Sequence, residues 1–163
     1  MSNITDLRGL FLHGLKDIYY AETQSKKTIA SMAEKATNSD LKSQLEAHAG
    51  HSDGHLKRLD QVFELIGEKA EGVKCEAMDG ILKESKHLMS EVSDAETRDA
   101  AIVFCAQAID HYEITRYGSL ATFAERLGYS EASELLGETL GEEEEADKRL
   151  SVLAESTLNK DAV

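Results

Sequence analysis

Proline and tryptophan are absent from this chain of 163 residues, and only two cysteines occur. Without proline, the strongest helix breaker, long uninterrupted helices are permitted throughout. Cys75 and Cys105 stand alone with no CxxC spacing, which fits a reducing compartment. No stretch approaches the roughly 20 apolar residues of a membrane span, and residues 1–6 lack the basic and apolar regions of a secretory signal. We therefore expect a soluble cytoplasmic protein without a membrane partner.

Positive charge is also scarce, because 18 lysines and arginines stand against 31 acidic residues, for a net charge of −13. Phosphate backbones require clustered lysine and arginine, and the sequence shows no such cluster. Nucleic acid is therefore not expected as a partner. The acidic excess fits solvated helix faces, and part of it fits cation binding.

Apolar residues recur at helical spacing over most of the length. Two predicted hairpins of long helices, residues 5–67 and 94–158, are joined by residues 68–93, which include a short amphipathic segment. A helix of about 28 residues is about 42 Å long, so this connection must run the length of the molecule. The sequence predicts one all-α domain over residues 1–163. Its expected fold is a ferritin-like four-helix bundle with one long crossover carrying a short fifth helix.

The two hairpins repeat each other in sequence. Residues 22–59 align without a gap with residues 113–150, at a shift of 91 residues, and 10 of the 38 positions are identical. A repeat of this length indicates one supersecondary unit used twice. Each copy begins with a lone glutamate, Glu22 or Glu113, and continues into a helix that carries several side chains able to bind metal.

Acidic and imidazole side chains interrupt the predicted buried face of every long helix. Because burial of an unpaired carboxylate is costly, several at the same height in a bundle favour a shared cation. Spacings of three or four residues place two ligands beside one metal. One ambiguity stays open in the last helix, where the repeat favours Glu142 and the buried face favours Glu143. The candidate metal ligands are Glu22, His48, His51, His55, Glu113, Glu142, Glu143 and Asp147.

Each feature also has a purely structural interpretation. A lone glutamate on an apolar face is often a boundary residue whose carboxylate reaches solvent. His48 alone would fit a hydrogen-bonded core histidine, and residues 141–145 would fit a solvated acidic face. The coincidence of such residues on four helices favours the metal site.

Several motifs spread over nearly the whole chain resemble the YciE/YciF family of bacterial stress-associated proteins. They are Tyr20–Gln24, Arg58–Phe63, Lys74–Gly80, Asp99–Ala101, His111–Glu113, Tyr117–Leu120 and Glu138–Leu140. The resemblance implies a ferritin-like bundle, a cytoplasmic homodimer and a di-iron site like that of rubrerythrin. Glu22, Glu113, Glu143 and Asp147 match the pattern of the family.

The second long helix departs from that pattern. It carries Gly50-His51 where family members tend to have paired glutamates ahead of the histidine. Imidazole in place of carboxylate shifts the preference of a site toward zinc, copper, nickel or iron and away from magnesium or manganese.

Two functions are compatible with the sequence. The first is a stress-response protein that binds metal in its core, with iron expected, a dinuclear site as one form and zinc or manganese as alternatives. It would carry out oxidase or peroxide chemistry like that of rubrerythrin. The second is a non-catalytic, dimeric structural or interaction module with a polar core and no functional metal. The sequence alone leaves catalysis open.

Overall fold

The computed structural model describes residues 4–163, and Met1–Asn3, which entered the expectations about a secretory signal and about the domain, lie outside that range. The described part is helical, without a strand. In none of its helices do length and apolar character suffice for crossing a membrane. The helices are α1 (Leu7–Lys35), α2 (Ser39–Leu65), α3 (Glu76–Glu91), α4 (Ala95–Arg126), α5 (Ser130–Leu153), the π-helix Ala154–Leu158 and α6 (Asn159–Asp161).

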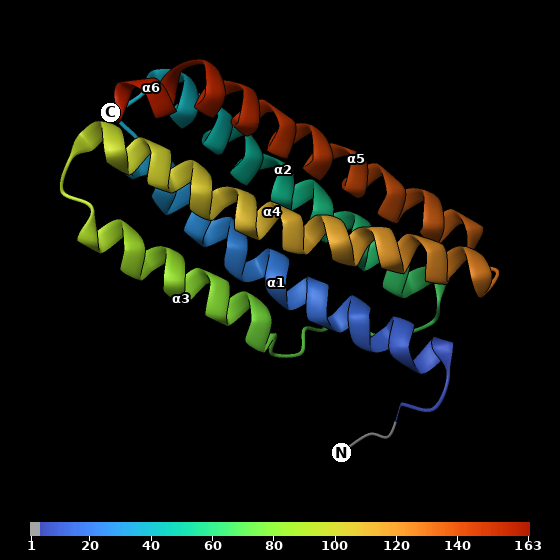
Figure 1. Ribbon diagram of the computed structural model, residues 1–163. Helices are drawn as coiled ribbons and strands as arrows, with labels where there is room; N and C mark the ends of the chain where they lie inside the picture. The colour runs from blue at the N-terminus through green and yellow to red at the C-terminus, as the bar shows by residue number, and fades with distance from the viewer. Residues whose placement is uncertain (1–3) are drawn as a thin grey trace.

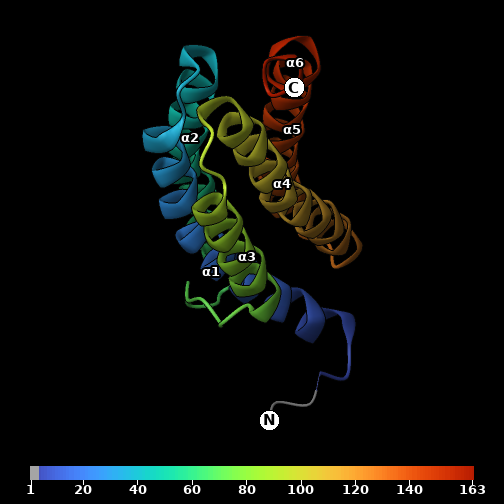
Figure 2. The same ribbon diagram turned by 60° about the vertical axis from the view of Figure 1, so that its left-hand side comes forward.

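The four long helices form a closed ring in which α1 packs against α2 and α4, and α5 packs against the same two helices (Figure 1). The short helix α3 lies outside this ring, against α4 and α1 (Figure 2). Because α3 returns along the bundle, α4 begins beside the turn between α1 and α2. The prediction of an all-α bundle with one long crossover and a short fifth helix is confirmed.

Glycines end two of the long helices. Gly67 after α2 and Gly128 after α4 have positive φ values of 71° and 83°, which glycine adopts at little steric cost. In each case the next residue donates its backbone N–H to the fourth residue before the glycine, Phe63 or Ala124, at 2.9 Å. This arrangement satisfies backbone carbonyls at the helix end and permits the sharp reversal into the following segment.

The buried carboxylate of Asp99 in α4 fixes the turn between α1 and α2. Its Oδ1 accepts a hydrogen bond from Thr37 N at 2.8 Å, and its Oδ2 accepts from Thr37 Oγ1 at 2.6 Å and from Asn38 N at 2.8 Å. The start of the second hairpin is thereby attached to the turn of the first. This attachment sets the longitudinal register of α4 against α1, and the register determines which side chains meet farther down the core.

We predict that Asp99→Ala lowers the free energy of unfolding by about 2–4 kcal/mol, because three hydrogen bonds to a buried carboxylate are lost. Urea denaturation followed by circular dichroism measures the change. Asp94→Ala is the matched control, since Asp94 caps the exposed start of the same helix and its loss should cost about 1 kcal/mol. Equal effects of the two substitutions would contradict the special role of Asp99.

Candidate metal centre

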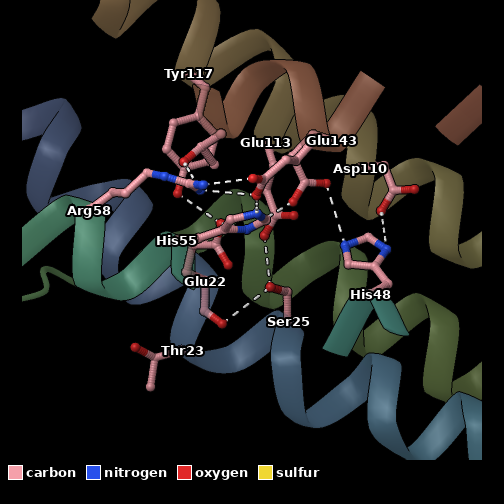
Figure 3. A network of polar contacts seen from close by, with 12 residues as sticks. Glu22, Thr23, Ser25, His48, His55, Arg58, Asp110, Glu113, Tyr117 and Glu143 are labelled. Atoms are coloured by element: carbon pink, nitrogen blue, oxygen red, sulfur yellow. Dashed lines mark hydrogen bonds and ion pairs between the residues drawn. The ribbon is translucent and has the colours of Figure 1, made fainter. Parts of the chain in front are cut away.

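Six titratable side chains meet in the core, near the middle of the four long helices (Figure 3). All are buried, and His48 is the most accessible of them at 6% exposure. They are Glu22 from α1, His48 and His55 from α2, Asp110 and Glu113 from α4, and Glu143 from α5. Helical spacing explains their convergence, because each lies on a face that is otherwise apolar, as Leu15 and Ile18 do in α1.

The six residues form two groups of metal-binding size that share one member. His48, Asp110, Glu113 and Glu143 each offer a ligand atom within 4.8 Å of the others, and so do Glu22, His55 and Glu143. Glu143 therefore lies between the two positions, where its two carboxylate oxygens face different histidines. The residues therefore form two adjacent groups of potential metal ligands that share one carboxylate.

The histidines hold the two groups together. His55 Nδ1 lies 3.0 Å from Glu22 Oε1 and 3.1 Å from Glu143 Oε1. His48 Nε2 lies 3.4 Å from Glu143 Oε2, and its Nδ1 lies 3.7 Å from Asp110 Oδ1. Each imidazole is thus positioned between two carboxylates from different helices.

Two hydroxyl groups orient the single glutamates of the repeat. Tyr117 Oη donates to Glu22 Oε1 at 2.7 Å, and Ser25 Oγ donates to Glu113 Oε1 at 2.7 Å. Both hydroxyl-bearing residues are buried. Glu22 Oε1 also contacts His55 Nδ1, and Glu22 Oε2 is left without a hydrogen-bond partner.

A pair of charged residues holds the far side of His55. Glu142 Oε2 lies 2.9 Å from His55 Nε2, and Arg58 binds both oxygens of Glu142 through Nη1 at 2.9 Å and Nη2 at 2.6 Å. Metal-binding histidines typically donate their second ring N–H to such a carboxylate, which fixes ring orientation and tautomer. Glu142 is therefore placed to orient His55 and leave Nδ1 facing the cluster.

In the metal-free cluster, bound protons neutralise part of the negative charge of the carboxylates. Burial disfavours charged imidazole at His48, but the hydrogen bond and charge of Glu143 outweigh it and raise the pKa of His48 to about 9. At His55, burial is likewise outweighed by Glu143 and Glu22, and its pKa rises to about 10. Both imidazoles are therefore protonated and positively charged at neutral pH.

The pKa values of the buried carboxyl groups are shifted in opposite directions. Burial raises the pKa of Asp110 to about 8, and burial with the charges of Glu22 and Glu143 raises the pKa of Glu113 well above its usual value. Burial would raise the pKa of Glu143 too, but hydrogen bonds and charges of the two histidines hold it at about 2. The shared carboxylate therefore stays ionised at neutral pH.

Five of the eight candidate ligands from the sequence lie within the cluster, namely Glu22, His48, His55, Glu113 and Glu143. The remaining three are placed elsewhere. Glu142 contacts His55 at its edge. His51 is exposed on α2, and Asp147 is bound to Gln107 and His111 at 2.9 and 3.1 Å. For all eight, ligation of a metal stays a prediction.

Asp110 was not among the residues selected from the sequence. Its carboxyl group is fully buried, and it precedes Glu113 by three residues, a spacing that places both on one side of α4. That spacing was the available signal. It was obscured because α3 covers α4 from outside, so that the buried arc of α4 is wider than the single face traced from the sequence.

The type and number of potential ligands in the cluster fit a pair of cations. Ferritin-like di-iron sites use four carboxylates and two histidines, which is also the content of this cluster. Several buried atoms lack a hydrogen-bond partner, including Glu22 Oε2, His48 Nδ1 and both Asp110 oxygens. Buried polar atoms normally have hydrogen-bond partners, so this concentration of unpartnered potential ligand atoms supports a cation as the missing partner.

Fold and site together define a one-crossover helical bundle with a carboxylate–histidine cluster at its centre. The chain belongs to the family described as Domain of unknown function (DUF892), whose model matches residues 6–163. It is 40% identical over 161 residues to Protein YciF of Escherichia coli (strain K12), covering 98% of this chain and 97% of that protein. The resemblance to the YciE/YciF family is thereby confirmed.

Solved structures agree with this membership. The crystal structure of the E. coli stress protein YciF matches with a TM-score of 0.91 and 39% identity, covering 96% of this chain and 99% of YciF. YcfI of Rhodopseudomonas palustris, whose description suggests a structural role, matches with a TM-score of 0.89 and 45% identity, covering 91% and 95% of the two chains. A protein from Xanthomonas campestris shares the fold at 22% identity, with a TM-score of 0.75 over 95% of each chain.

We predict that the metal-free protein loses stability as pH rises from 7 to 10. The pKa values of His48 and His55 are raised above 6.5, so their stabilising contribution is complete below pH 6.5 and is lost through pH 9–10. The raised pKa of Asp110 adds a loss between about pH 4 and 8. One pKa unit is worth about 1.4 kcal/mol, and each kcal/mol shifts the melting temperature of a chain of this length by about 2–4 °C. Melting temperatures measured with a chelator should therefore fall by at least about 10 °C between pH 7 and 10.

His48→Ala should flatten this profile, whereas His51→Ala should leave it unchanged because His51 is exposed. A melting temperature that stays constant or rises toward pH 10 in the chelated wild-type protein would contradict the assignment of protons to the two buried imidazoles.

Proposed function

We propose that this protein binds two divalent cations, with iron as the expected metal, in a ferritin-like carboxylate–histidine centre that serves stress defence by oxidising Fe(II). The observation that carries the proposal is the pair of ligand groups joined at Glu143. Four helices supply the groups, and their carboxylates and imidazoles would otherwise be buried without adequate partners.

Each position has a distinct set of protein donors. His48, Asp110, Glu113 and Glu143 would fill one cation position with four ligands, while Glu22, His55 and Glu143 would supply three at the other. A position with fewer protein ligands keeps room for an exogenous molecule. Bound iron would supply one-electron redox chemistry, and the surrounding core would exclude bulk water.

Donor chemistry favours iron or zinc over magnesium or calcium, since two imidazoles accompany the carboxylates. The name of YciF as a stress protein supports a stress role by similarity. The two free, buried cysteines fit a reducing compartment, in agreement with a cytoplasmic protein. A homodimer is the assembly that the family resemblance implies.

We predict that protein purified without added metal and titrated anaerobically with Fe(II) binds two equivalents and is stabilised by them. At a free metal concentration 100 times the dissociation constant, each site adds about 2.7 kcal/mol. Asp110→Asn should remove one equivalent and Glu22→Gln the other, whereas Glu143→Gln should remove both. Elemental analysis after desalting and melting curves with and without chelator measure these effects.

Glu144→Gln is the matched control, because Glu144 follows Glu143 on α5 and is exposed. Asp110→Asn keeps the shape of the protonated carboxyl group, so its fold should be intact in the metal-free state. If the wild-type protein takes up no metal under any loading, the proposal is overturned. The cluster would then be a polar network of imidazolium–carboxylate pairs that specifies packing in a structural module.

Catalysis is tested separately from binding. We predict that the loaded protein, supplied with further Fe(II) and with dioxygen or hydrogen peroxide, consumes Fe(II) at least about tenfold faster than buffer with the same iron, because a fixed site removes the cost of assembling the reactants. A chelator that reports Fe(II) colorimetrically follows the loss. Glu143→Gln should reduce the rate to that of buffer, and equal rates for the wild-type protein and buffer would exclude the oxidase role.

A further inference from the structure

A cavity of about 500 Å³ lies between α2 and α5, beside the cluster. Leu45 and Leu150 contribute apolar surface, and Glu138, Glu142 and Glu145 contribute carboxylates along α5. A cavity needs only about 10–15 Å³ of such space to hold one water molecule, so this one has room for many. The cavity is thus large enough for a cation with a complete shell of water ligands.

His48 connects this cavity to the cluster. Of the six cluster residues, it is the one that forms part of the cavity wall. Its side chain is 6% exposed, whereas the other five are at most 1% exposed. Its Nδ1 is buried without a hydrogen-bond partner. A second connection runs through Glu142, which lines the cavity and contacts His55 Nε2 at 2.9 Å.

We propose that this cavity is the passage by which hydrated divalent cations reach the buried cluster, with His48 as the first cluster ligand that they meet. The proposal rests on the proposed function, since it requires that the cluster binds metal. It goes further in assigning one face of the bundle, between α2 and α5, to metal uptake.

The composition of the wall suits transit rather than permanent binding. Carboxylates outnumber guanidinium groups, because the three glutamates Glu138, Glu142 and Glu145 are paired with two arginines, Arg58 and Arg149. His51 lies in the same wall, and its imidazole can replace water on a passing cation. The exposed position of His51, which keeps it out of the cluster, places it where a cation arrives.

Gly141 offers a way to block the passage without disturbing the core. It lies in the cavity wall, and a Cβ atom added there would have no atom within 4 Å. Gly137, one turn earlier on α5, is equally open but is not part of the wall. The native Cys75 and Cys105 are buried at 2% and 3% exposure, so a thiol introduced at either glycine can be modified selectively.

The test compares Gly141→Cys with Gly137→Cys, each before and after modification with an aromatic thiosulfonate reagent. Uptake of Co(II) is followed by its visible absorption in a stopped-flow instrument, and the dissociation constant is measured by titration. Modified Gly141→Cys should load at least about tenfold more slowly, because loading must then wait for local opening of the helices. Its final absorbance and dissociation constant should be unchanged, and reductive removal of the label with a phosphine should restore the rate.

Modified Gly137→Cys should load as the wild-type protein does. Unchanged loading of modified Gly141→Cys would overturn the proposed passage while leaving metal binding intact, and so would equal slowing at both positions. Absence of Co(II) and Fe(II) binding in the unmodified wild-type protein would instead overturn the proposed function, and the passage with it.

Discussion

The interaction on which this structure depends is charge compensation between the two imidazoles of α2 and the carboxylates that surround them. Four acidic side chains in a helical core would repel one another, and each would lose its hydration. The histidines contact acids from three other helices, so the same contacts that relieve the repulsion hold the ring of helices in register. Asp99 sets that register from the end of the bundle, and the cluster sets it from the middle.

Protons and cations are alternative means of meeting this constraint. Protons on His48, His55 and Asp110 offset part of the negative charge of the cluster, and two divalent cations would offset the charge of four carboxylates beside two neutral imidazoles. Metal binding would therefore exchange protons for cations without leaving excess charge in the core, as expected where ligands must lose protons to bind.

The fold was predictable because helical periodicity is a local property, and the crossover followed from the lengths of the helices and of the segment that joins the two hairpins. The buried faces also identified Glu22, Glu113, Glu143, His48 and His55, since each replaces an apolar residue in a regular pattern. The part played by Arg58 was not predictable. It depends on how α2 packs against α5, where Arg58 holds Glu142 against His55, and no periodicity within one helix contains that information.

The two hairpins contribute unequally to the cluster although they repeat each other in sequence. Glu22 and Glu113 occupy equal places in the two copies, but at the same shift of 91 residues Asp110 corresponds to Tyr19 and His55 to Ala146. The second hairpin supplies Asp110, Glu113 and Glu143, whereas the first supplies Glu22 and both histidines. A shortage of carboxylates in α2 is thus offset by an extra one in α4. The set of potential ligands is complete only when both hairpins are considered together. The balance between carboxylates and imidazoles is therefore not apparent from either hairpin alone.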